Sequence, residues 1–318
     1  MSSERVHRTT HEETVAAPVG VVYGLVSDAV RGPLYFPPSV HVEPLESDGV
    51  YERLRMWATV NGQVESWTSR RTLDPQTWRV EFRHELPATP VQSMGGSWIM
   101  EPAGAGRTRL ALLHDFTVAD DDVDRAAWVR RGIDTNSRAE LASLRRLAEC
   151  WPRFDELVLS FEQSVRVHGP AELAYDFLYR IGDWPESVPH VTRVDFTEDA
   201  PGVQIMSTQT RTADGSSHTT ESVRVCFPHA GRIVHKQTAT PRLVSAHSGA
   251  WDVVPDETGA TVIAQHTVVL NEEHITEELG EDADTATARR YVRDALGRTS
   301  TAMLDLAKEH AESAVTVL

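Results

Sequence analysis

Val15-Ala16-Ala17-Pro18, followed by Val21-Val22-Tyr23-Gly24-Leu25, opens a pattern that occurs twice in the chain. It returns as Val167-His168-Gly169-Pro170 followed by Leu173-Ala174-Tyr175-Asp176-Phe177, a shift of 152 residues. Solenoid repeats have periods of about 20 to 50 residues, so a period this long corresponds to a whole domain. The sequence therefore predicts a tandem duplication.

Later segments of the two halves keep the same shift, between 151 and 153 residues. The matched segments are residues 88–90 with 239–241, 96–102 with 249–255, and 113–118 with 265–270. Between the halves, Cys150-Trp151-Pro152-Arg153 ends a helical pattern at a proline, and a new extended run begins at Leu157. We expect two domains, residues 1–150 and 151–318, each large enough to bury a core of its own.

The composition is that of a globular protein, with 40% hydrophobic and 25% charged residues. No apolar stretch approaches the roughly 20 residues that a membrane-spanning helix needs, and residues 1–7 lack the apolar core of a signal peptide. Because only Cys150 and Cys226 are present, we expect a soluble protein of the reducing cytoplasm. The net charge of −16 repels nucleic acid and anionic lipid, so neither is an expected partner.

Each half combines strand patterns with one long helical pattern. A strand near residues 8–16 leads through Pro18 into an amphipathic helix. The clearest strand is Trp78-Arg79-Val80-Glu81-Phe82-Arg83-His84-Glu85-Leu86, in which charged residues alternate with inward-facing ones. A long helix follows the last strand of each half. These patterns predict an α+β protein of two tandem helix-grip domains, each a curved antiparallel sheet wrapped around a long C-terminal helix with an internal pocket.

The run 64–73 places an arginine on an apolar strand face. Four residues alternate along this face: Trp67, Ser69, Arg71 and Leu73. A buried arginine is costly unless it is paired, and it can bind carbonyl, enolate or phosphate oxygens. The alternative is an arginine that pairs internally or extends to the pocket mouth. The second half carries Ser222 and Arg224 at the matching positions, and this repetition favours a functional role.

Histidines lie on apolar strand faces in both halves. His114 matches His266, and His84 is matched with His235. A lone histidine on such a face is more often a satisfied core residue, but imidazole is also the natural acid or base near neutral pH. Both interpretations stay open, and the occurrence in both halves strengthens the functional one.

Trp98 and Trp251 occupy one repeat position, where an aromatic wall could stack on a flat, carbonyl-rich ligand. Core packing explains these tryptophans nearly as well. In the first long helix, Asn136 and Glu140 interrupt the apolar stripe. Asn136 is therefore a candidate ligand for a bound molecule, or else a residue that caps a frayed turn.

Metal and cofactor sites are not indicated by any motif. The 14 histidines include no pair with the spacing of a structural zinc site, so no metal site is expected. The chain also lacks a Gly-x-Ser-x-Gly elbow and a phosphate-binding glycine loop, so we expect no nucleotide cofactor.

Several of these segments together resemble a known family. They are Glu65-Ser66-Trp67-Thr68-Ser69-Arg70-Arg71, Gly96-Ser97-Trp98, Val15-Ala16-Ala17-Pro18 and Asp134-Thr135-Asn136-Ser137-Arg138-Ala139. The chain resembles bacterial polyketide aromatase/cyclases, which are members of the lipid-transfer (START) and birch-pollen-allergen superfamily. The tandem arrangement is similar to the didomain branch that works with reducing type II polyketide synthases.

The resemblance implies a ketoreduced poly-β-ketone substrate held by an acyl carrier protein. It implies that the protein closes the first ring and removes water to make it aromatic, with no cofactor. The family's pocket arginine falls on Arg71 and on Arg224, and its pocket tryptophans fall on Trp67 and Trp98, with Trp251 in the second half. His114 or a bound water would then move protons. Thr220 replaces Trp67 in the second half, so the two pockets are not expected to be equal.

Two other classes of function compete with this interpretation. A non-catalytic carrier or receptor for an apolar ligand would need the cavity but not Arg71. An interaction module would have filled cores and an apolar surface patch.

Overall fold

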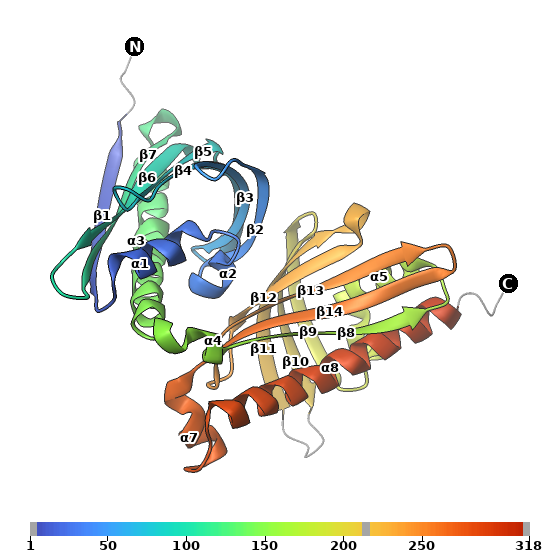
Figure 1. Cartoon of the computed structure of the whole chain (residues 1–318). Coiled ribbons are helices and arrows are strands. Elements are labelled where there is room, and N and C mark those ends of the chain that lie inside the picture. The colour runs from blue at the N-terminus through green and yellow to red at the C-terminus, as the bar shows by residue number, and fades with distance from the viewer. Residues whose placement is uncertain (1–4, 212–216, 314–318) are drawn as a thin grey trace. The chain divides into compact units, whose positions relative to one another are not determined.

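Two seven-stranded antiparallel sheets are found in the described part of the chain, residues 5–211 and 217–313 of a computed structural model. The chain divides into two units, Met1–Phe154 and Asp155–Leu318, each with one sheet and one long helix (Figure 1). In the first unit the strand order is β1-β7-β6-β5-β4-β3-β2, and in the second it is β8-β14-β13-β12-β11-β10-β9. The identical order confirms the predicted α+β class with a C-terminal helix in each half.

The elements of the first unit follow one another with short connections. They are β1 (His7–Val15), α1 (Val19–Ser27), α2 (Gly32–Tyr35), β2 (Ser39–Ser47), β3 (Tyr51–Val60), β4 (Gln63–Asp74), β5 (Arg79–Leu86), β6 (Val91–Pro102), β7 (Thr108–Val118), η1 (Ala119–Asp121), α3 (Val123–Glu149) and η2 (Trp151–Arg153). A single turn, α4 (Phe154–Leu157), leads into the next strand.

The second unit repeats this order. Its elements are β8 (Val158–Val167), α5 (Ala171–Tyr179), η3 (Ile181–Asp183), α6 (Trp184–Ser187), β9 (Val191–Ala200), β10 (Val203–Arg211), β11 (Ser217–Phe227), η4 (Pro228–Ala230), β12 (Arg232–Ala239), β13 (Val244–Asp256), β14 (Gly259–Leu270), η5 (Glu272–His274), α7 (Ile275–Leu279) and α8 (Thr285–Ser313).

The long helix of each unit packs against the strands that come first and last along the chain in that unit. These are β1 and β7 for α3, and β8 and β14 for α8. Helix α3 is capped by Asp122, whose Oδ1 accepts the backbone N–H of Arg125 at 2.8 Å and so satisfies one of the unpaired donors of the first turn. Its apolar stripe, including Val129 and Ile133, packs with Phe116 at the end of β7. The helix therefore covers one edge of the concave sheet.

The prediction that Leu86 faces inward at the end of the strand 78–86 is wrong. Val80 is buried, but Leu86 is 61% exposed. The reason is that β5 pairs with β6 only as far as Arg83, so the end of the strand leaves the sheet on that side. Trp78 lies before the strand, with a positive φ of 53°.

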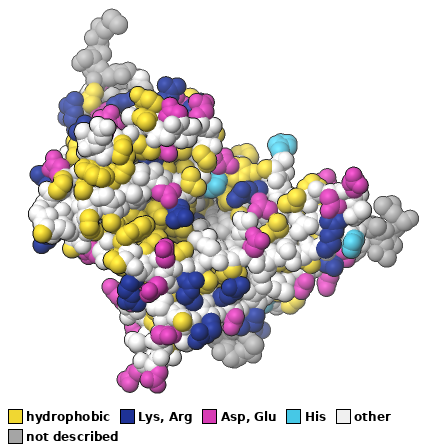
Figure 2. All heavy atoms as spheres, in the orientation of Figure 1, with side chains coloured by type: hydrophobic (Ala, Val, Ile, Leu, Met, Phe, Trp, Pro, Cys, Tyr) yellow, Lys and Arg dark blue, Asp and Glu magenta, His cyan; other side chains and the backbone are white. Residues whose placement is uncertain are grey.

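The charged side chains are distributed without segregation on the face shown in Figure 2. Basic and acidic groups are interspersed there, so on this face the net charge of −16 does not gather into one acidic field. Among the described residues, no helix is both long enough and apolar enough to cross a bilayer.

Gly96 and Gly249 occupy matching positions at which the neighbouring strand leaves no room for a side chain. A Cβ added to Gly96 on β6 would lie 2.0 Å from the Leu113 carbonyl oxygen and 2.6 Å from Cζ of Phe82. A Cβ added to Gly249 on β13 would lie 2.2 Å from the Gln265 carbonyl oxygen. Glycine in a strand allows this close backbone approach. The matched segments 96–102 and 249–255 thus share a steric constraint.

We expect Gly96→Ala to lower the free energy of unfolding by at least about 1–3 kcal/mol, because the new methyl group overpacks against backbone that cannot move aside. Gly24→Ala is the control, since nothing lies within 4 Å of its added Cβ and α1 should gain about 0.5–1 kcal/mol. Urea unfolding of the full chain, followed by tryptophan fluorescence, measures both. Equal stability of the two variants would contradict the steric argument.

Candidate active site in the first unit

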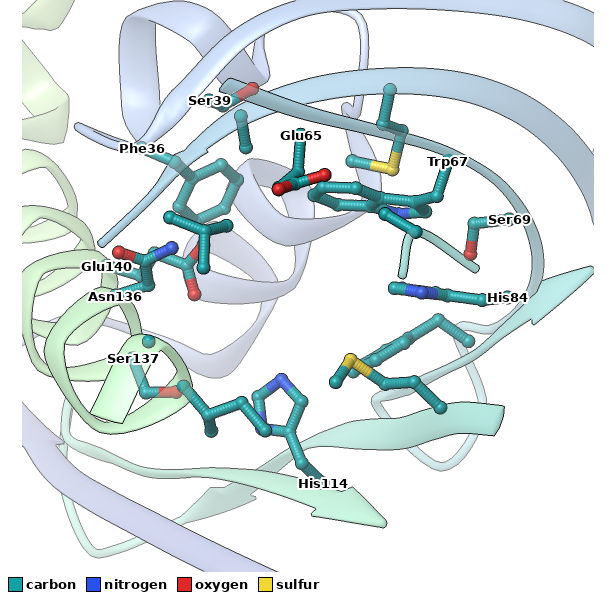
Figure 3. Close-up of a pocket in the computed structure, with 18 of the residues that line it drawn as sticks. Phe36, Ser39, Glu65, Trp67, Ser69, His84, His114, Asn136, Ser137 and Glu140 are labelled. Carbon is teal, nitrogen blue, oxygen red and sulfur yellow. The ribbon is translucent and has the colours of Figure 1, made fainter. Parts of the chain in front are cut away.

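A cavity of about 210 Å³ lies between the sheet and helix α3 of the first unit. On the same measure one water molecule needs only about 10–15 Å³, so the cavity can hold an organic molecule. Its walls are mostly apolar and aromatic. The polar or aromatic residues that line it include Phe36, Ser39, Glu65, Trp67, Ser69, Arg71, His84, Trp98, His114, Asn136, Ser137 and Glu140. All of these except Arg71 and Trp98 are labelled in Figure 3.

The alternation of β4 brings four of these side chains to one wall. Glu65, Trp67, Ser69 and Arg71 all face the cavity, as period-two spacing requires. Sequence reasoning missed Glu65, although it continues the series that includes Trp67 and Ser69. Burial raises the pKa of the Glu65 carboxyl. This group therefore keeps a proton more readily than an ordinary glutamate.

Arg71 is held by the end of helix α1. Its Nη2 donates to the carbonyl oxygens of Val26 at 2.8 Å and Ser27 at 3.1 Å, and its Nε lies 3.7 Å from Glu52 Oε2. Burial lowers the pKa of the guanidinium, and the Glu52 carboxylate opposes that shift. The arginine thus caps carbonyls at the end of the helix, of which that of Ser27 also accepts the backbone N–H of Ala29 at 3.0 Å. Arg71 also lines the cavity, and its Nη1 makes no hydrogen bond with any described residue.

Two histidines face the cavity as neutral bases. Burial, assisted by the nearby His114, lowers the pKa of His84 to about 3, and its ring stacks on Trp67 with centroids 5.0 Å apart. Burial, assisted by His11, lowers the pKa of His114 to about 4. The buried Nδ1 of His114 has no hydrogen-bond partner among the described residues. A neutral imidazole with an unused nitrogen can accept a proton from a bound molecule.

Helix α3 supplies the opposite wall, with Asn136, Ser137 and Glu140 pointing to the cavity (Figure 3). Asn136 was predicted as a ligand, but its Nδ2 donates to the Thr59 carbonyl oxygen at 2.9 Å. Asn61 Nδ2 similarly donates to the Trp128 carbonyl oxygen at 2.9 Å. The two amides therefore attach the β3–β4 hairpin to α3. Ser137, which sequence reasoning missed, is buried and its hydroxyl has no described partner.

The predicted site residues of the second unit lie in different surroundings. Arg224 Nη2 donates to the Leu178 carbonyl oxygen at 2.6 Å, the counterpart of the bond from Arg71 to Val26, but its Nη1 is buried without a described partner. Trp251 packs against the apolar core of its unit, and Ser222 is half-buried on β11. A second pocket remains a prediction.

The match of His84 with His235 is wrong. In the sheets, His235 pairs with Gly249 as Phe82 pairs with Gly96, so the counterpart of His235 is Phe82. The true shift is 153 residues, two more than the predicted 151. A two-residue slip keeps a side chain on the same face, so alternation alone cannot reveal the error. His266 and His114 do correspond, because they pair with Gly249 and Gly96.

Removing Arg71 should destabilise the first unit strongly. Oε2 of Glu52 is buried with no hydrogen-bond partner among the described residues, so Arg71→Ala leaves this carboxylate uncompensated and should cost about 3–5 kcal/mol. Arg70→Ala is the neighbouring control, because that side chain is 73% exposed and its ion pair is worth about 0–1 kcal/mol. Urea unfolding should also show that Glu52→Gln restores part of the loss in the Arg71→Ala background. A double variant no more stable than Arg71→Ala would argue against this pairing.

Acid should destabilise the first unit through its buried histidines. The unfolded chain binds protons at these side chains below about pH 6.5, whereas folded His114 stays neutral down to about pH 4. The free energy of unfolding is therefore not reduced by these histidines above pH 6.5. Below that pH it decreases, by up to about 1.4 kcal/mol per pH unit for each histidine. Unfolding measured at pH 7, 6 and 5 should give a shallower pH dependence for His114→Gln than for the wild type. Identical slopes would contradict the neutral buried state.

Comparisons with known proteins identify the family of the chain. A family model described as "Polyketide cyclase / dehydrase and lipid transport" matches residues 6–149 and again residues 158–311. The granaticin polyketide synthase bifunctional cyclase/dehydratase of Streptomyces violaceoruber is 45% identical, over 99% of this chain and 97% of the relative. The actinorhodin polyketide synthase bifunctional cyclase/dehydratase of Streptomyces coelicolor is 43% identical, over 96% of each chain.

Solved structures with the same two-unit organisation are also similar. The di-domain ARO/CYC BexL from the BE-7585A biosynthetic pathway is 46% identical with a TM-score of 0.83, covering 96% of this chain and 99% of BexL. The di-domain ARO/CYC StfQ from the steffimycin biosynthetic pathway is 32% identical with a TM-score of 0.81, covering 97% and 99%. These matches confirm the resemblance to didomain aromatase/cyclases. Because the family model covers both halves, the chain belongs to the family of polyketide cyclases and dehydrases.

Proposed function

We propose that this protein is the bifunctional cyclase/dehydratase of a type II polyketide synthase, and that it closes and aromatises the first ring of a ketoreduced poly-β-ketone. The observation that carries the proposal is the convergence of Glu65, Arg71 and His114 on one apolar cavity. Relatives named as polyketide synthase bifunctional cyclase/dehydratases support it at 43–45% identity over nearly the whole chain.

The cavity suits a reactive and flexible substrate. A poly-β-ketone has acidic methylene groups between carbonyls, so in water it condenses in several ways. An enclosed pocket restricts the chain to one folded conformation and excludes water from the reacting atoms. Trp67 and Trp98 supply flat walls on which the conjugated product can stack. The shape of the cavity then selects the carbon atoms that meet.

Ring closure is an aldol step. Neutral His114 takes a proton from a methylene carbon, and the resulting enolate carbon bonds to a carbonyl carbon of the same chain. The carbonyl oxygen becomes an alkoxide, which Nη1 of Arg71 stabilises as its charge develops. The alkoxide then takes up the proton that His114 had removed, so the imidazole is neutral again and the step yields a ring alcohol with no net change in oxidation state.

Loss of water completes the ring. Neutral His114 removes the hydrogen next to the alcohol, the C–O bond breaks, and a C=C bond forms. Glu65, whose raised pKa favours the protonated form, donates its proton to the departing hydroxyl, which leaves as water. Repeated elimination and enolisation give the aromatic ring, and no redox cofactor is required by this balance.

The partner that delivers the substrate is proposed to be the acyl carrier protein of the synthase. A polyketide chain that is attached to the carrier protein can enter the pocket of the first unit while one of its ends stays attached to the carrier. The second unit, in which Thr220 stands where the first has Trp67, is proposed to support or bind rather than to perform the same chemistry.

Product profiling with matched variants tests this function. A minimal synthase, its carrier protein and a ketoreductase are combined with wild type, with His114→Gln, or with His266→Gln, the same repeat position in the second unit. Arg71→Ala is unsuitable as the main test, because it also removes the cap of α1. We expect His114→Gln to slow ring closure by about 100-fold or more, and His266→Gln to keep the wild-type product. Glu65→Gln should accumulate the ring alcohol before dehydration.

An identical product mixture with and without the protein would overturn the enzyme proposal. It would favour the non-catalytic carrier, particularly if the purified protein still retained the polyketide. An unchanged rate in His114→Gln with a reduced rate in His266→Gln would move the chemistry to the second unit.

A further inference from the structure

Three histidines of the second unit come from adjacent strands and meet inside it. His235 lies on β12, His247 on β13 and His266 on β14, and the three offer nitrogen atoms that all lie within 4.8 Å of one another. The closest pair is His247 Nε2 and His266 Nδ1, at 3.0 Å. The ring centroids are 5.2 to 6.2 Å apart. The ligand atoms therefore converge on one small volume.

We propose that His235, His247 and His266 bind one divalent transition-metal ion, with Zn²⁺ as the probe. Imidazole nitrogens suit ions of this class, and three histidines leave one coordination position open in a tetrahedral site. With Zn–N bonds of about 2.0–2.1 Å, neighbouring ligand atoms in such a site lie roughly 3.3 Å apart. The closest observed pair is already near this separation, so small side-chain adjustments suffice.

The protonation of the three rings agrees with metal binding. Burial lowers the pKa of His247 to about 3 and the pKa of His266 to about 4, and it lowers that of His235 well below its usual value. All three are therefore neutral at pH 7, which is the form that coordinates a metal. No proton has to be removed from a charged imidazolium before the ion can bind.

Ser300 orients His266 for this role. The Ser300 hydroxyl lies 2.8 Å from the Leu296 carbonyl oxygen, which can only accept, so the hydroxyl hydrogen points there. The Ser300 oxygen must then accept from Nε2 of His266, which lies 2.6 Å away. This assigns the proton of His266 to Nε2 and leaves the lone pair of Nδ1 directed at His247. Such an outer hydrogen bond fixes the tautomer of metal-ligating histidines.

His235 is held in place although its Nδ1 has no described partner. That nitrogen is buried without a hydrogen bond, which is costly for a polar atom. The ring lies against Gly249, where an added Cβ would be 2.9 Å from Nε2. Arg224 pairs with His235 across β11 and β12 and its positive charge acts on that ring, while its Nη2 donates to the Leu178 carbonyl oxygen and its guanidinium lies over the Trp184 ring. Between the other two rings, His247 Nε2 donates to the lone pair of His266 Nδ1, so a bound cation would replace this hydrogen bond and displace the proton from Nε2 of His247.

The first unit lacks this cluster, which makes it an internal comparison. By strand pairing, Phe82 stands in place of His235 and Met94 in place of His247, while His114 corresponds to His266. His235 and His247 are 12 residues apart, His247 and His266 are 19 residues apart, and each lies on a different strand. No short sequence motif therefore indicates the cluster. The expectation of no metal site rested on motif spacing alone.

Zinc titration of the full chain, freed of any histidine tag and treated with a chelator, tests the proposal. Calorimetry should give one ion per chain, and Co²⁺ should give the intense visible absorption of a tetrahedral site. His247→Met and His235→Phe place the first unit's own residues at these positions, and each should weaken Zn²⁺ binding by more than about 100-fold. Ser300→Ala should weaken it by about 10- to 100-fold. His229→Gln, an exposed histidine of the same unit, should leave binding unchanged.

Saturating Zn²⁺ should also raise the unfolding temperature of the wild-type second unit, because the ion binds only the folded state. This measurement does not depend on whether a variant folds. Binding of Zn²⁺ to folded His247→Met with wild-type affinity would overturn the proposal, as would a wild type that takes up no ion and gains no thermal stability.

Discussion

A buried guanidinium sets the distance between the first helix and the sheet in each unit. Arg71 and Arg224 both donate to backbone carbonyls at the ends of the short helices α1 and α5. A buried charge must keep its partners, since losing one costs several kcal/mol. The helix therefore cannot settle onto the sheet or drift from it without breaking this contact. In the first unit the fixed separation leaves room for a cavity.

The same anchor has different consequences in the two units. Arg71 lines the cavity of the first unit, whereas Nη1 of Arg224 is buried with no described partner. Near it, the hydroxyl of Tyr175 and the side chain of Cys226 are also buried, and burial raises the pKa of Cys226 to about 11. One duplicated frame thus holds a site suited to carbonyl chemistry in the first unit and a histidine cluster in the second. The divergence arises from side chains at equivalent positions, such as Phe82 and His235, and not from a change of topology.

Much of the fold follows from alternation and repetition that are visible in the sequence. The inward face of β4 was predicted from Trp67, Ser69 and Arg71, and the structure brings these residues together with His84, Trp98, His114 and Asn136. The parts that escaped prediction depend on pairing across strands. His235 was assigned a counterpart two residues away from the true one, because both choices face inward. His247 was missed because its neighbours in space are on other strands. The bond that engages Asn136 comes from a hairpin more than 70 residues earlier.

The pairing of the first strand with the last governs how each sheet is completed during synthesis. His7 pairs with Phe116 and Leu159 pairs with Val268, so about a hundred residues must be made before either first strand has its partner. Until β7 has been synthesised, β1 exposes a mostly polar sequence of histidine, threonine and glutamate. Strand β8 is richer in valine, leucine and phenylalanine, and an unpaired apolar strand readily associates with other chains. We therefore expect the second unit to be the part of the chain most prone to aggregate during synthesis. This tendency should be greatest between the synthesis of β8 and that of β14.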